Sequence, residues 1–169
     1  IPDDRKDDII ENVEAGARGW RAYIGSVLTP IGVLVVLAAV SGIFLFFGNM
    51  LFGGQASFRQ VLSMYAHAGV IAVPASVVKV PLILAQQSLR VQTNLALFLS
   101  ADAEQSLLYR LLAKFDIFTI WEVILLIIGL AAIYRFSNGR ASAIVLTLWG
   151  LWIAVSLALG SVFQGFGFA

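Results

Sequence analysis

Four long apolar stretches divide the chain, and polar or glycine-rich segments separate them. They cover residues 27–47, 61–85, 117–134 and 141–163. A helix needs about 20 apolar residues to cross roughly 30 Å of hydrocarbon, and each stretch comes near that length. Since backbone amides in lipid must be paired within their own segment, the stretches are predicted to be helices. The expected fold is therefore all-α, a polytopic bundle of four transmembrane helices.

The segment before the first stretch has a helical pattern of its own. Its apolar positions recur at helical spacing among acidic and basic residues: Ile9, Ile10, Val13, Ala17, Trp20 and Ile24. This pattern predicts an amphipathic helix at the membrane interface, with an ordinary soluble helical linker as the alternative. The predicted domain division is an acidic N-terminal segment over 1–26, a transmembrane domain over 27–163 and a short tail over 164–169.

The long connection over residues 86–115 has a second amphipathic helical pattern near its end. The apolar side chains recur at helical spacing, while Arg110 and Lys114 fall on the other side of the helix; these apolar residues are Leu107, Leu108, Leu111, Leu112 and Phe115. We therefore expect a second interfacial helix that leads into the third span. The five-residue segment 136–140 is a short turn, so the third and fourth spans should form an antiparallel hairpin.

Composition supports residence in a membrane. The chain is 60% hydrophobic and 12% charged, with a mean hydropathy of +0.91, whereas soluble domains are about half apolar and about a quarter charged. Six of the ten acidic residues lie within the first fourteen positions. The chain has no cysteine, which excludes disulfides, thiolate nucleophiles and cysteine-ligated metals.

Two residues at the start of the third span, Asp116 and Trp121, are predicted to have structural roles. Asp116 is the last polar residue before the apolar run, where a carboxylate can accept a hydrogen bond from a free helix amide, so we predict it to be the helix N-cap. Trp121 lies about one turn further along the helix, and its amphipathic ring suits the aromatic belt of a membrane interface. We therefore predict Trp121 to be an interface aromatic residue.

Glu122 lies inside the same span, where a charged side chain is costly. Lys79 lies toward the end of the second span, on the same side of the membrane and at a similar predicted depth. A Lys79–Glu122 ion pair would offset the cost of both charges. Two alternatives stay open: Lys79 extends separately to the headgroups while Glu122 is protonated or faces water, or the residues belong to a proton or ion site.

The second span carries the chain's single histidine, His67, and two prolines, Pro74 and Pro81. We expect His67 to be a hydrogen-bonded bundle residue and not a metal ligand, because no second imidazole exists and no carboxylate lies at a matching depth. The prolines predict a kink or a break in the helix. Broken helices occur at transport sites, and this keeps a transport role open.

Small residues at four-residue spacing mark predicted helix-packing faces, since they let helix backbones approach closely in lipid. Such residues are Ala38 and Gly42 in the first span and Gly150, Ala154 and Ala158 in the fourth. Motifs of soluble enzymes, such as phosphate loops and dinucleotide fingerprints, are absent, as are zinc-protease and serine-hydrolase motifs. We therefore expect no catalytic residue, no metal and no cofactor. Without a basic cluster we also expect no nucleic-acid partner.

Three blocks follow one another along the chain: FGGQASFRQVLSMYAHA over residues 52–68, FDIFTIWEVILLIIGLAAI over 115–133, and SNGRASA before the tryptophan-bearing last span. Their order and spacing resemble the YIP family, the Ypt/Rab-interacting-protein family of polytopic membrane proteins, in its bacterial branch. The resemblance implies a helical bundle of five spans, so one span is expected upstream of Ile1. Eukaryotic members act in vesicle traffic by binding Rab GTPases or shaping membranes, but the segment that binds GTPases has no counterpart here.

Two functional hypotheses follow. The first is a non-enzymatic scaffold, in the inner membrane of a bacterium, whose partners are the lipid bilayer and other membrane proteins or further copies of the chain. The alternative is a transporter or channel component that uses Lys79, Glu122 and His67. The orientation in the membrane stays open, because the distribution of lysine and arginine and the five-span layout implied by the resemblance favour opposite answers.

Overall fold

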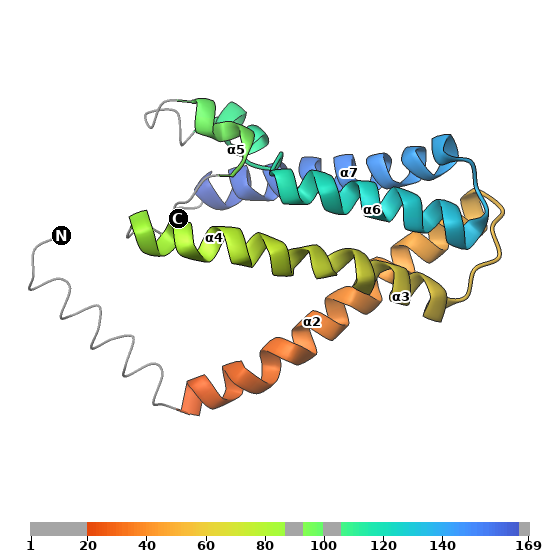
Figure 1. The fold of residues 1–169 in the computed structure, drawn as a ribbon, viewed down its shortest axis with the longest axis horizontal. Helices are drawn as coiled ribbons and strands as arrows, with labels where there is room; N and C mark the ends of the chain where they lie inside the picture. Colours follow the sequence, from red (N-terminus) through yellow and green to blue (C-terminus); the bar gives the residue numbers. More distant parts are fainter. Residues whose placement is uncertain (1–19, 87–92, 100–105, 166–169) are drawn as a thin grey trace, which may run out of the picture. The chain divides into compact units, whose positions relative to one another are not determined.

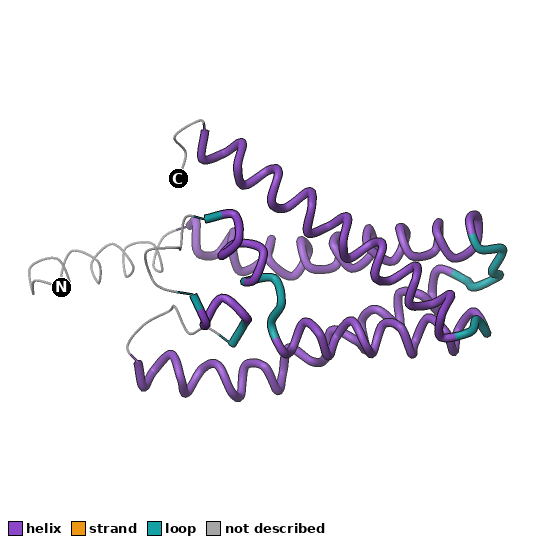
Figure 2. Tube along the Cα trace, turned by 90° about the horizontal axis from the view of Figure 1, so that it is seen from above, coloured by secondary structure: helices purple, strands orange, loops and turns teal. Residues whose placement is uncertain are grey.

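The computed structural model describes residues 20–86, 93–99 and 106–165, and these are almost entirely helical (Figures 1 and 2). The elements are α2 (Trp20–Phe46), the π-helix η1 (Phe47–Leu51), α3 (Phe58–Ala68), the 3-10 helix η2 (Gly69–Ile71), α4 (Ala72–Gln86), the 3-10 helix η3 (Leu95–Phe98), α5 (Leu107–Leu112), α6 (Ile117–Tyr134) and α7 (Asn138–Gly165). Within these ranges the chain forms no strand, only an isolated bridge between Asn94 and Asp116.

Four stretches of helix are long and apolar enough to cross a membrane, which confirms the predicted fold class. They are Ile24–Leu51, Phe58–Ala85, Ile117–Tyr134 and Asn138–Gly160. Three of them begin three residues before the predicted apolar stretch. At Phe58 and Asn138 the reason is that polar residues form the first turn of the helix. At α3, for example, Ser57 and Gln60 make a reciprocal capping box, which supplies the partners that the first free amides need.

The chain divides into two compact units, residues 1–40 and residues 41–169. The described part of the first unit is helical, and its side chains from Ile24 to Val36 are exposed, as expected for a helix that faces lipid. The predicted amphipathic helix lies largely outside the described residues, since its positions before Trp20 are not among them. The boundaries proposed at residues 26 and 163 stay predictions.

In the second unit, α6 packs against both α3 and α7. The α6–α7 hairpin predicted from the short turn is present, with the two helices side by side (Figure 1). Buried side chains recur every three or four residues along each helix: Val61, Met64 and Ala68 on α3, Val123, Leu126 and Leu130 on α6, and Ala141, Ile144 and Val145 on α7. One face of each helix therefore builds the core, while the other faces lipid.

The second span is interrupted, as its prolines predicted. The 3-10 turn η2 separates α3 from α4, and Pro74 follows at the third position of α4. Proline lacks an amide hydrogen, so the carbonyl of Val70 has no partner four residues ahead. Pro81 lies inside α4. The two halves of the span are thus joined by a change of helix type.

Close packing in the second unit uses glycines that the sequence pattern did not single out. A Cβ atom on Gly129 of α6 would lie 2.7 Å from Met64 Cγ on α3. Cβ atoms on Gly48 and Gly54 would lie 2.4 and 2.2 Å from the Tyr134 ring. The predicted packing residues lie elsewhere: Gly42 is half-buried, and Ala38, Gly150, Ala154 and Ala158 are exposed. Their role in helix packing stays a prediction. Because most of them are exposed, that packing would be against a helix of another molecule.

Candidate functional site

Lys79 of α4 and Asp116, directly before α6, form an ion pair with Lys79 Nζ 3.1 Å from Asp116 Oδ2. The Lys79 ammonium also lies 5.4 Å from the centre of the Phe118 ring, a cation–π distance. The Thr93 hydroxyl donates a hydrogen bond to the same Asp116 oxygen. We call these four residues, Lys79, Thr93, Asp116 and Phe118, the clasp, because they join α4, the segment 93–99 and α6.

Asp116 is also the N-cap of α6, as predicted. Its Oδ1 accepts a hydrogen bond of 2.9 Å from the Phe118 amide. The two carboxylate oxygens thus have separate roles, since Oδ1 caps the helix while Oδ2 binds Thr93 and Lys79. A buried carboxylate with this set of donors is well compensated for its loss of hydration.

Backbone contacts hold Thr93 in place. The Leu95 amide donates to the Phe115 carbonyl at 3.2 Å, and the Ile117 amide approaches the Thr93 carbonyl at 3.5 Å. The Asn94 side chain caps η3 by accepting from the Ala96 amide at 3.0 Å. The segment 93–99 is therefore fastened to the start of α6 by main-chain bonds on both sides of Asp116.

The clasp lowers the pKa of Asp116. Burial raises the pKa of this carboxyl, but the hydrogen bonds from Thr93 and from the Phe118 amide, together with the Lys79 ammonium, lower it by more. The net pKa lies below its usual value, so Asp116 is ionised at neutral pH. The negative charge of Asp116 is therefore stabilised by a hydroxyl, a backbone amide and an ammonium group.

The structure corrects the predicted Lys79–Glu122 pair, because Lys79 pairs with Asp116. Glu122 is half-buried on α6, four residues beyond Phe118. A lysine side chain extends more cheaply toward the membrane interface than toward the bilayer centre. Asp116, at the very start of the span, is therefore the less costly partner. Trp121, beside Glu122, is 48% exposed, and its position in the aromatic belt stays a prediction.

A second cluster ties α5 to the later part of α7. Arg110 Nη2 donates to the Leu157 carbonyl at 3.2 Å, and the Lys114 ammonium lies 4.8 Å from the centre of the Trp152 ring. Phe115 packs edge-on against Trp149 at 5.1 Å. A helix is present at the predicted place, but it ends at Leu112, so Lys114 and Phe115 lie beyond it. Arg110 and Lys114 contact α7, while Leu107 and Leu108 are exposed. The position of α5 at the membrane interface stays a prediction.

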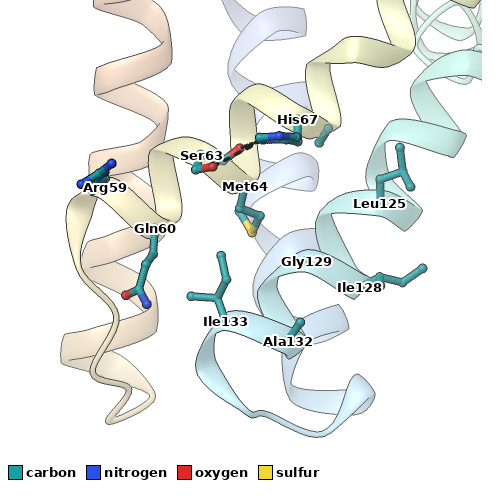
Figure 3. A pocket seen from close by; sticks show the side chains of 11 residues that line it. Arg59, Gln60, Ser63, Met64, His67, Leu125, Ile128, Gly129, Ala132 and Ile133 are labelled. Atoms are coloured by element: carbon teal, nitrogen blue, oxygen red, sulfur yellow. Dashed lines mark hydrogen bonds between the residues drawn. The ribbon is translucent and has the colours of Figure 1, made fainter.

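His67 lies in an open groove of about 630 Å³ between α3 and α6 (Figure 3). Its Nδ1 is 2.6 Å from the Ser63 carbonyl oxygen, one turn earlier in α3. The Nδ1–H tautomer donates to that oxygen, in agreement with the predicted hydrogen-bonded histidine. The lining residues are Arg59, Gln60, Ser63, Met64, His67 and Ala68 of α3, and Leu125, Ile128, Gly129, Ala132 and Ile133 of α6.

Comparison with known protein families matches the Yip1 domain over residues 12–160. The chain belongs to the Yip1 domain family. The match includes the four spans, the clasp and the groove, so these features lie within the family domain. It also agrees with the resemblance carried by the three sequence blocks. Searches of curated proteins and of solved structures returned no match for this Yip1 domain chain.

Proposed function

We propose that this Yip1 domain protein is a non-enzymatic membrane scaffold that organises membrane or binds partner proteins. The supporting observation is the separation of its intramembrane polar residues. Lys79 is held in the clasp, and the groove that His67 lines includes neither Lys79 nor Glu122. A transport path built on these three residues would need them around one cavity. Their placement favours structural roles.

The outer surface of α7 supports binding to another membrane helix. Gly150, Ala154 and Ala158 recur every fourth residue and are exposed. Small residues at this spacing let a second helix approach closely, which favours association where the hydrophobic effect is weak. The proposed partners are other membrane proteins or further copies of the chain. The resemblance to bacterial members supports placing the scaffold in a bacterial inner membrane.

Photocrosslinking in the native membrane tests the scaffold role. A photoreactive amino acid is placed at Gly150 or at Ala154, and at Val77 as the control, since Val77 is 68% exposed on α4. We expect one discrete adduct, either with a second copy of the chain or with one membrane protein, from positions 150 and 154 and none from position 77.

The transport alternative is measured in parallel, as ion flux into proteoliposomes that contain the purified protein. The scaffold proposal expects no flux above that of empty liposomes. Absence of discrete adducts, together with a flux that Lys79→Met or Glu122→Gln abolishes, would reverse the assignment in favour of transport.

A further inference from the structure

The groove between α3 and α6 combines a polar edge with an apolar wall. Arg59, Ser63 and His67 follow one another at four-residue intervals along α3, so they form a stripe with steps of about 6 Å along the helix axis. The opposite wall is apolar and comes from α6, with Leu125, Ile128, Ala132 and Ile133. Figure 3 shows Met64 extending from α3 into the space between these two sides.

The groove runs from the membrane interface toward the interior. Arg59 is the second residue of the span Phe58–Ala85, and Ile133 is next to the last residue of the span Ile117–Tyr134. Both therefore lie at the interface end. His67 and Leu125 lie about two turns deeper along their helices. The fixed charge of the groove is thus at headgroup depth, and its apolar wall runs from Ile133 at that depth to Leu125 at the depth of acyl chains.

Charge and shape together indicate an amphiphile. Of the eleven lining residues, all within the described ranges, Arg59 alone carries a permanent charge and none is acidic. Arginine binds phosphate oxygens through paired N–H donors, and the Ser63 hydroxyl is a further donor one turn deeper. The volume of about 630 Å³ is within the range of about 300–1,000 Å³ found for small-molecule sites.

We propose that this groove binds an anionic phospholipid from the surrounding bilayer. Its phosphate lies against Arg59 and Ser63, and one acyl chain lies along Leu125, Ile128 and Ala132. Ile128 is 59% exposed, so the chain covers apolar surface that faces outward from the bundle. The inference rests on the groove alone and holds whether or not the scaffold role is correct.

Native mass spectrometry of the purified protein tests this site. The probes are phosphatidylglycerol and phosphatidylcholine with identical acyl chains, added at equal concentration in mild detergent. Arg59→Gln removes the charge, and Ala132→Phe fills the groove from an exposed position. Arg140→Gln and Ala143→Phe are the matched controls, since both residues are exposed near the same end of the second unit and neither lines the groove.

We expect the unmodified protein to retain phosphatidylglycerol in preference to phosphatidylcholine. Arg59→Gln should weaken retention of phosphatidylglycerol roughly tenfold, the size expected for one charge-assisted hydrogen bond, and leave phosphatidylcholine unchanged. Ala132→Phe should reduce retention of both lipids, and the controls should behave like the unmodified protein. Thermal unfolding of every variant checks that the bundle is intact.

Four results would overturn the proposal. They are no retained phospholipid, equal retention of the two lipids, an Arg140→Gln loss as large as that of Arg59→Gln, and a dimer that Ala132→Phe disperses. An Arg140→Gln loss as large as that of Arg59→Gln would mean that positive charge anywhere on this side of the protein attracts the lipid. A dimer that Ala132→Phe disperses would mean that a second copy of the chain occupies the groove.

Discussion

Lys79 Nζ lies 3.1 Å from Asp116 Oδ2. This contact joins α4, the second half of the interrupted span, to the residue that directly precedes α6. The side chain of Lys79 is 35% exposed and that of Asp116 is 12% exposed. The pair is therefore shielded from solvent more than a surface ion pair, yet it is not sealed inside the bundle. Thr93, from the long connection, completes the arrangement.

The pair should be energetically coupled. We expect Lys79→Met and Asp116→Asn each to lower the free energy of unfolding by about 1–3 kcal/mol, between the values typical of exposed pairs and of broken buried pairs. The double variant should lose less than the sum, because removing one partner already removes the interaction. Thermal unfolding in detergent, followed by helical circular dichroism, gives the coupling energy.

Glu122→Gln provides the control for this cycle. Combined with Lys79→Met it should give additive losses, since the ion pair of Lys79 is with Asp116. Coupling between positions 79 and 122 as large as that between 79 and 116 would contradict the clasp.

Acidification should weaken the clasp. The pKa of Asp116 is lowered in the folded protein from the usual value of 3.8, so the unfolded chain binds this proton more readily. The contribution of Asp116 to stability is therefore complete above pH 3.8 and is lost as the pH falls through the lower folded pKa. The measurement is the difference in melting temperature between the unmodified protein and Asp116→Asn as a function of pH.

That difference should be constant from pH 7 to about pH 5 and should shrink below the unfolded pKa of 3.8. Taking the difference against Asp116→Asn cancels the titration of the other carboxylates. A difference that stays the same down to pH 2, or that grows on acidification, would show that the carboxylate of Asp116 is not stabilised in the folded state.

Tyr134 should make Gly48 and Gly54 sensitive to substitution. A Cβ atom at either glycine would overlap the Tyr134 ring, so we expect Gly48→Ala or Gly54→Ala to destabilise the protein by about 1–3 kcal/mol, as overpacking does. Gly150→Ala is the control, because a Cβ atom there meets no other atom within 4 Å and alanine favours helix. Differential scanning fluorimetry in detergent measures the three variants.

A second test separates the clash from other effects of losing glycine. If the Tyr134 ring causes the loss, Gly48→Ala should cost less in a Tyr134→Ala background than in the unmodified protein, because the three atoms nearest a Cβ at Gly48 all belong to Tyr134. The prediction fails if the cost of Gly48→Ala is the same in both backgrounds.

The local features of the membrane fold were predictable because they depend on short-range chemistry. The apolar stretches identified four spans, since length and hydropathy alone decide whether a helix can cross lipid. Asp116 was recognised as a cap because a carboxylate before an apolar run faces free amides. The interruption before Pro74 follows from a missing amide hydrogen within one turn.

The partner of Lys79 was not predictable from depth along the chain. Counting residues placed Lys79 near the level of Glu122, but the pairing also depends on the direction in which each side chain points around its helix. That direction is set by how α4 continues after the 3-10 turn η2. Thr93 gave no signal either, because the bonds that hold it run from the connection to the start of α6.

The sequence by itself determined that this chain is a helical membrane protein of a recognisable family, because composition, periodicity and motif order are properties of the chain. Only the tertiary structure decided which polar residues meet. It paired Lys79 with Asp116, placed His67 in the α3–α6 groove and set Tyr134 against two glycines. These contacts join positions far apart in the sequence, and they depend on packing angles and helix rotation, which no local pattern encodes.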